Sequence, residues 1–172
     1  MDFFNTFCSQ ISKFEKTNMS LWILIVLVIV SGGSSVLLSQ SFAQESDNLT
    51  GTFNHTQTDA SGNVDWLNTG NWSLTGITSG SPSFDAVIDM AKPDGSAAHD
   101  HQISEFMMIG SPVSQGNETI LNGTSTITMR EGPVTEEPTS ITLSDERISV
   151  FFEPSKIDNH FGNQSVTGIV SS

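Results

Sequence analysis

The chain has little cysteine, no tyrosine and few basic residues. Its one cysteine, Cys8, precedes a long apolar segment, so the part of the chain that follows this segment has no thiol for a disulfide or a metal. With 6 Lys and Arg against 19 Asp and Glu, the formal net charge is −13. Because so acidic a surface repels phosphate backbones, we expect no nucleic-acid partner.

The apolar segment predicts export. Residues 21–38, LWILIVLVIVSGGSSVLL, contain no charged side chain and follow two lysines. An uncharged run of this length can enter a bilayer, which predicts a signal peptide or signal-anchor helix at 21–43 after a cytoplasmic region at 1–20. Small residues at Ser41 and Ala43 favour cleavage after Ala43, whereas an uncleaved segment would hold the chain in the membrane as one transmembrane helix. Either outcome places the remaining residues outside the cell or at its surface.

Asparagine residues in N-x-S/T sequons are frequent after the apolar segment. Chance predicts roughly two such sequons for this composition, so their number favours glycosylation. The alternative is that a chain rich in Ser and Thr produces sequons without carrying sugars. The six candidate positions are Asn48, Asn54, Asn71, Asn117, Asn122 and Asn163.

The exported part divides into a linker and a β domain. Residues 44–63 contain few large apolar side chains, so we expect a disordered, flexible linker there. Residues 64–172 contain short segments that alternate apolar and polar side chains between turn residues, as half-buried antiparallel strands do. Residues 84–90 show this alternation, and residues 140–152 are typical of a hairpin. About seven such strands predict a single all-β domain, either an antiparallel β-sandwich or a small β-barrel.

The stretch DGSAAHDHQISEF, residues 94–106, contains a candidate metal site. On a strand, His99 and His101 point to the same side, and that side continues through apolar residues and Glu105. His160 precedes the last predicted strand, and a turn at the same end of the domain would bring it to the pair. Without a thiolate, a blue-copper or cysteine-rich zinc site is excluded, which leaves zinc, copper, iron or manganese. The alternative is that the histidines only cap a strand and a turn.

The spacing H-x-H-x3-E of His99, His101 and Glu105 resembles the first metal motif of the cupins. The resemblance implies that these three residues bind a metal inside a β-barrel and that a later histidine, here His160, is the fourth ligand. The sequence departs from the cupin pattern in the positions of its glycines, and no Pro-x-Gly precedes His160.

A looser resemblance covers more of the chain. The segments SFAQ, GNWSL, DGSAAHDHQISEF and DNHFG together look like small secreted archaeal proteins of no assigned function. This similarity implies an extracellular or envelope β domain and supplies no activity.

The sequence therefore predicts a non-catalytic, glycosylated β domain of the cell envelope that binds a divalent metal, copper or zinc. It contains no G-x-S-x-G elbow, phosphate-binding glycine loop or H-E-x-x-H motif. Two alternatives are a cupin-like metalloenzyme and an adhesion or surface-layer module without metal. In either non-catalytic case we expect a glycan or protein of the cell envelope as a partner.

Overall fold

The computed structural model describes residues 47–171. The predicted cytoplasmic region, signal or anchor helix and first linker residues lie outside this range. Within it, no helix is long and apolar enough to span a bilayer.

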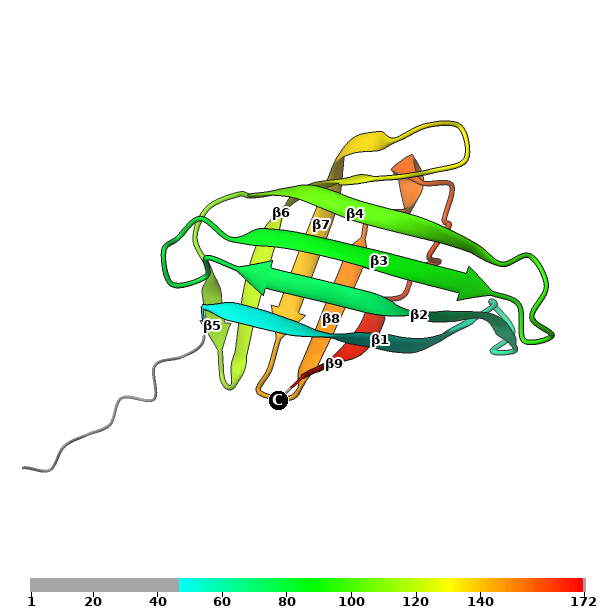
Figure 1. Ribbon diagram of the computed structural model, residues 1–172, viewed down its shortest axis with the longest axis horizontal. Coiled ribbons are helices and arrows are strands. Elements are labelled where there is room, and N and C mark those ends of the chain that lie inside the picture. Colours follow the sequence, from blue (N-terminus) through cyan, green and yellow to red (C-terminus); the bar gives the residue numbers. More distant parts are fainter. Residues whose placement is uncertain (1–46, 172) are drawn as a thin grey trace, which may run out of the picture. The chain divides into compact units, whose positions relative to one another are not determined.

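Nine strands and one short 3-10 helix make up the described chain (Figure 1). Every pair of neighbouring strands is antiparallel. In order, the elements are β1 (Asn48–Thr58), β2 (Val64–Thr75), β3 (Ser83–Ala91), β4 (His99–Met108), β5 (Val113–Gln115), β6 (Glu118–Ile127), β7 (Val134–Leu143), β8 (Arg147–Phe152), η1 (Pro154–Lys156) and β9 (Val166–Val170).

Eight of the strands close into a barrel. The sheet runs β4-β3-β2-β1-β9-β8-β7-β6, and β4 also pairs with β6, so the first and last strands of this series meet. The short strand β5 pairs with β6 alone. The all-β prediction is confirmed, and the structure selects the barrel over the sandwich. The interior of an eight-stranded barrel is just wide enough to be filled by side chains.

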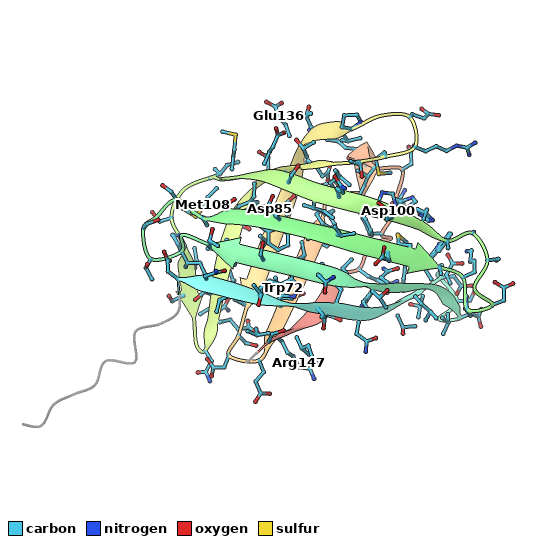
Figure 2. All side chains as sticks on the ribbon, viewed as in Figure 1. Trp72, Asp85, Asp100, Met108, Glu136 and Arg147 are labelled. Carbon is cyan, nitrogen blue, oxygen red and sulfur yellow. The ribbon has the colours of Figure 1, made fainter. Side chains whose placement is uncertain are left out.

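The core follows the alternation seen in the sequence. On β3 the side chains of Phe84, Ile88 and Met90 are buried, while Asp85 and Asp89 between them are exposed. Figure 2 shows the side chains of the whole barrel, with Asp85 on β3. The predicted hairpin is also present, as β7 and β8, and its apolar residues point inward. The core combines residues from all eight barrel strands with two from the β8–β9 connection, Ile157 and Phe161.

The predicted linker is wrong for residues 48–58, which form β1. This strand pairs with β2 along its whole length and with β9, so its backbone groups are satisfied in the sheet. Its inward positions are mostly small or polar, with Gly51, Phe53, His55 and Gln57 on that face. A prediction based on the number of large apolar residues therefore missed this strand, which joins β2 to β9 in the barrel mainly through backbone hydrogen bonds. The β domain begins at Asn48 rather than Val64.

A β-bulge in β4 changes which residues point inward. Glu105 and Phe106 together lie opposite one residue of β6, Ser125, and Glu105 has a φ of 55°. An extra residue shifts the alternation by one. Phe106 is consequently buried, whereas Glu105 is exposed and accepts a hydrogen bond from Thr126 Oγ1 at 2.7 Å. The predicted role of Glu105 as a metal ligand beside His99 and His101 is therefore wrong.

The connections at one end of the barrel gather around the histidines. We call this end the pocket end, and its connections are residues 59–63, 92–98, 128–133 and 153–165. The chain enters β1 and leaves β9 at the opposite end, where the β2–β3 and β7–β8 turns also lie. The candidate site is thus formed by the first residues of β4 and by loops that a closed and well-packed barrel holds in place.

One charged side chain is buried in the barrel wall. Glu137 on β7 is 0% exposed, and neither of its carboxylate oxygens has a hydrogen-bond partner. Burial raises the pKa of Glu137 to about 6. Glu137 therefore binds a proton more tightly in the folded protein than in the unfolded chain.

Replacing Glu137 should stabilise the protein at neutral pH. The pKa of Glu137 is 4.5 in the unfolded chain and about 6 in the folded protein. The contribution of this group to the free energy of unfolding is therefore fully present below pH 4.5 and is lost as the pH rises through about 6. Glu137→Met removes the buried charge, so its free energy of unfolding should exceed that of the wild type by about 1 kcal/mol at pH 8. The gain should shrink toward pH 4. Urea unfolding at both pH values measures it, and a larger gain at pH 4 would contradict the assignment.

Candidate metal centre

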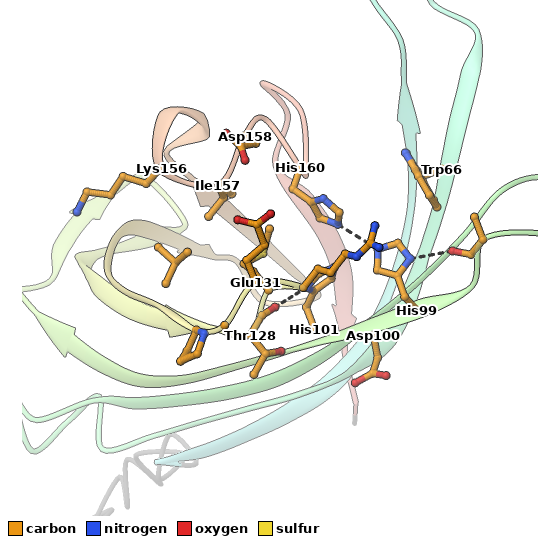
Figure 3. A pocket seen from close by; sticks show the side chains of 16 residues that line it. Trp66, His99, Asp100, His101, Thr128, Glu131, Lys156, Ile157, Asp158 and His160 are labelled. Carbon is orange, nitrogen blue, oxygen red and sulfur yellow. Dashed lines mark hydrogen bonds between the residues drawn. The ribbon is translucent and has the colours of Figure 1, made fainter.

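Three imidazoles converge at the pocket end. His99 and His101 lie on one face of β4, and His160 lies in the turn that follows η1. One ring nitrogen from each histidine lies within 4.8 Å of the other two (Figure 3). The prediction that the turn of His160 would meet the pair on β4 is confirmed. Three imidazoles at this separation could hold one metal ion.

Backbone carbonyls orient two of the three rings. The Nδ1 of His101 lies 2.6 Å from the carbonyl oxygen of Thr128, and the Nδ1 of His99 lies 2.8 Å from that of Ala97. A carbonyl only accepts, so each Nδ1 must carry the hydrogen and donate. In a neutral ring this leaves the lone pair on Nε2. Metal-binding histidines are oriented in the same manner, by donating the second ring N–H to a carbonyl or carboxylate.

The two Nε2 atoms released in this way point into the cluster. The Nε2 of His101 is buried and has no hydrogen-bond partner. The Nε2 of His99 lies 3.0 Å from the Nε2 of His160. Because His99 accepts through this atom when neutral, His160 must donate from Nε2. If this proton moved to Nδ1 of His160, the Nε2 atoms of all three histidines would carry lone pairs that a single metal ion could accept.

Burial favours the neutral forms of His101 and His160. It lowers the pKa of His160 to about 4, with a further contribution from His101 and His99. Burial also lowers the pKa of His101, against the opposing hydrogen bond to Thr128. Both rings are therefore unprotonated at pH 7 and have lone pairs to donate. The contribution of these two rings to the free energy of unfolding of the metal-free protein should fall as the pH drops from 6.5 toward 4, because the unfolded chain protonates them before the folded protein does.

The affinity for zinc should decline gradually below pH 6.5. Three independent imidazoles with the ordinary pKa of 6.5 would lose about three decades of affinity per pH unit. Since His101 and His160 stay unprotonated to lower pH, we expect a slope below about two decades per unit between pH 6 and 5. Calorimetric titration at several pH values measures this slope. A slope of about three would contradict the lowered pKa values.

Strand β1 holds the loop of His160. The side-chain amide of Gln57 donates to the carbonyl oxygen of His160 at 3.2 Å and accepts from Asn68 at 3.4 Å. Gln164 fastens the same loop, because its amide donates to the carbonyl oxygen of Thr58 at 2.7 Å. Sequence reasoning missed Gln57 because it assigned residues 44–63 to a linker. The inward position of Gln57 on an alternating segment was the available signal.

Removal of the Gln57 amide should weaken metal binding without removing a ligand. In Gln57→Ala the His160 loop loses one anchor, and we expect a loss of about tenfold in zinc affinity. Thr56→Ala, at the exposed neighbouring position, is the matched control and should bind as the wild type does. Calorimetric titration of both variants measures the difference. Equal affinities would show that Gln57 does not position His160.

Aromatic rings enclose the histidines. Trp66 contacts His99 edge to face at a centroid distance of 5.2 Å, and Phe161 contacts His101 at 5.4 Å. Lys92 lies 3.9 Å above the centre of Trp66 and makes an ion pair with Asp65. This packing restricts the rotation of the imidazoles, which favours a preformed site.

Comparisons of the chain with protein-family models, curated proteins and solved structures gave no match.

A pocket of about 920 Å3 opens beside the cluster. All three histidines line it, together with Trp66 and residues of the β6–β7 and β8–β9 connections. In Figure 3 the side chain of Asp100 points away from the three rings, on the other face of β4. The remaining lining residues include Met129, Arg130, Glu131, Lys156 and Asp158. The cluster is therefore accessible from one side.

The sequon asparagines all lie on the outer surface. Each of the six is exposed, and they occur on strands and turns around the barrel. Asn163 is in the connection that carries His160, whereas Asn48 and Asn117 lie at the other end of the barrel. None of the six lines the pocket.

Proposed function

We propose that this chain is an exported cell-envelope domain that binds one divalent transition metal, copper or zinc, through His99, His101 and His160. The observation that carries the proposal is the arrangement of hydrogen bonds on the rings. Two imidazoles donate Nδ1–H to carbonyls, so that their Nε2 lone pairs meet the third ring. If the histidines only capped a strand and a turn, the buried Nε2 of His101 would be expected to have a hydrogen-bond partner, and it has none.

Copper and zinc fit the donor set best. Imidazole nitrogen is neither a hard nor a soft ligand, and it suits both ions. Among the divalent first-row transition metals, Cu²⁺ generally has the highest affinity for such a site. Calcium and magnesium require oxygen ligands, and the cluster presents nitrogen alone. Two histidines and one carboxylate form a common site for iron. The predicted residues do not form this site, because Glu105, the predicted carboxylate ligand, lies on the outer face.

Export and glycosylation are supported by different residues. The uncharged segment at 21–38 supports export, with the domain secreted or held at the surface by that segment. The exposure of all six sequon asparagines supports glycosylation, because a transferase must reach the side chain. Mass spectrometry of the corresponding peptides from the native source would measure occupancy. Unmodified asparagine at all six positions would contradict this part of the proposal.

The metal proposal is tested by metal content and titration. The full chain, purified without a histidine tag, should contain copper or zinc by inductively coupled plasma mass spectrometry. After removal of the metal by a chelator, calorimetric titration should show one tight site per chain. A chain that is metal-free as purified and binds neither ion would overturn the proposal. In that case the structure would favour a surface module that contacts glycans or proteins without metal.

A further inference from the structure

We propose that the bound metal keeps one coordination position open toward the pocket, and that a small anion binds there with Arg130 as its protein partner. This inference rests on the proposed metal site and adds the class of ligand that the site receives.

The proposed metal has three protein ligands. Within residues 47–171 the cluster contains His99, His101 and His160 and no fourth histidine, cysteine or carboxylate. Structural zinc sites are closed by four protein ligands, whereas sites with three keep a position for water or substrate. Glu105, the residue that the sequence offered as another ligand, lies on the outer face. The fourth ligand must therefore come from outside the set.

The open side of the cluster faces the pocket. The inner side of the cluster is covered, because His101 is only 3% exposed and packs against Phe161. His99 is covered on one side by Trp66. The pocket of about 920 Å3 touches all three rings, and pockets that bind small molecules have roughly 300 to 1,000 Å3. An external ligand reaches the metal from this pocket.

A free basic side chain of the pocket can bind an anion. Residues 47–171 contain four basic side chains, and two of them, Arg130 and Lys156, line the pocket. Lys156 already donates to the carbonyl oxygen of Glu136 at 2.9 Å. Arg130 makes no ion pair or side-chain hydrogen bond with the part of the chain described here. A guanidinium presents several N–H groups in a plane and suits small oxyanions and carboxylates.

The acidic lining residues make the binding dependent on the metal. Glu131 and Asp158 also line the pocket, so that without a metal its charge is not positive. The divalent ion supplies the charge that lets an anion displace water from the open position. We therefore expect anion binding to the metal-loaded protein and none to the metal-free protein.

Azide is the probe, and the full chain loaded with one equivalent of Cu²⁺ is the sample. Titration with azide should produce a saturable charge-transfer absorption band that the metal-free protein lacks. In Arg130→Gln the dissociation constant for azide should rise about fivefold, as expected for loss of one exposed charge partner. Arg147→Gln removes an exposed charge of the same kind at the start of β8, at the far end of the barrel (Figure 2). The backbone of Arg147 pairs there with Ile169 of β9. This control should bind azide as the wild type does.

The outcomes separate the two proposals. Electron paramagnetic resonance that shows Cu²⁺ with three nitrogen ligands, but no response to azide, would overturn the open position and leave the metal site standing. A chain that binds no copper would overturn both. An azide response that appears only in Met129→Leu would show that the thioether of Met129, which also lines the pocket, closes the coordination shell. Equal azide affinities in the wild type and Arg130→Gln would remove Arg130 from the site.

Discussion

Substitution of His101 by Ala should weaken zinc and copper binding at least about 100-fold. His101 is the most buried of the three candidate ligands, at 3% exposure, and its ring is fixed by Thr128. Two remaining imidazoles do not complete a stable coordination set, and no carboxylate in the cluster can replace the third. Calorimetric titration measures the loss. Loss of even one weak contact changes an affinity about tenfold. An affinity within about threefold of the wild type would therefore contradict the assignment of His101 as a ligand.

The control for this experiment is His55→Ala. His55 also lies on an inward face, but on β1, and its Nδ1 lies 3.3 Å from Thr167 Oγ1. The substitution should lower the free energy of unfolding while the metal stoichiometry stays the same. His101→Gln, which keeps most of the side-chain volume, guards against a folding defect. Thermal unfolding of each metal-free variant shows whether the loss of binding has another cause.

Gly168→Val should destabilise the protein by about 3 kcal/mol, because it opens the seam between β1 and β9, the first and last strands along the chain. Gly168 on β9 is paired with Phe53 on β1, and a Cβ there would collide with the carbonyl oxygen of Thr52. Gly51 has the same constraint on the other strand, against the carbonyl oxygen of Ile169. Backbone atoms cannot move aside as a flexible side chain can. The strands would have to separate, and the β1–β9 hydrogen bonds would be lost.

Urea unfolding measures this change, with Ile169→Thr as the control. Ile169 is the next residue on β9 and is 55% exposed, so its substitution should change the free energy of unfolding by less than about 1 kcal/mol. Similar effects of the two substitutions would show that the seam does not depend on the absence of a Cβ at Gly168.

Alternation in the sequence predicted most of the fold. It identified the inward face of β3 and the β7–β8 hairpin, because large apolar residues mark the buried side of each strand. It failed at β1, where the inward residues Gly51, His55 and Gln57 are small or polar. Their burial is made favourable by strand pairing and hydrogen bonds with residues more than 100 positions away. Such partners cannot be read from a local pattern.

The candidate site was predictable to the same extent. His99 and His101 share a face because they precede the bulge in β4, so simple alternation holds for them. It does not hold for Glu105, whose left-handed backbone conformation reverses the direction of the following residues. The contribution of His160 depended on where the β8–β9 connection folds, which only the closed barrel determines. The carbonyls of Ala97 and Thr128 carry no side-chain signal at all.

The position of the end of β9 relative to the pocket has a practical consequence. The strand β9 ends at Val170, at the end of the barrel opposite the three histidines. A chip surface, fluorophore or partner domain attached behind this strand would therefore be separated from the pocket by the length of the barrel. Immobilisation through the carboxyl terminus should leave the metal and its ligands free to exchange with solution. The loops at the pocket end can then be varied one at a time on a barrel that stays attached.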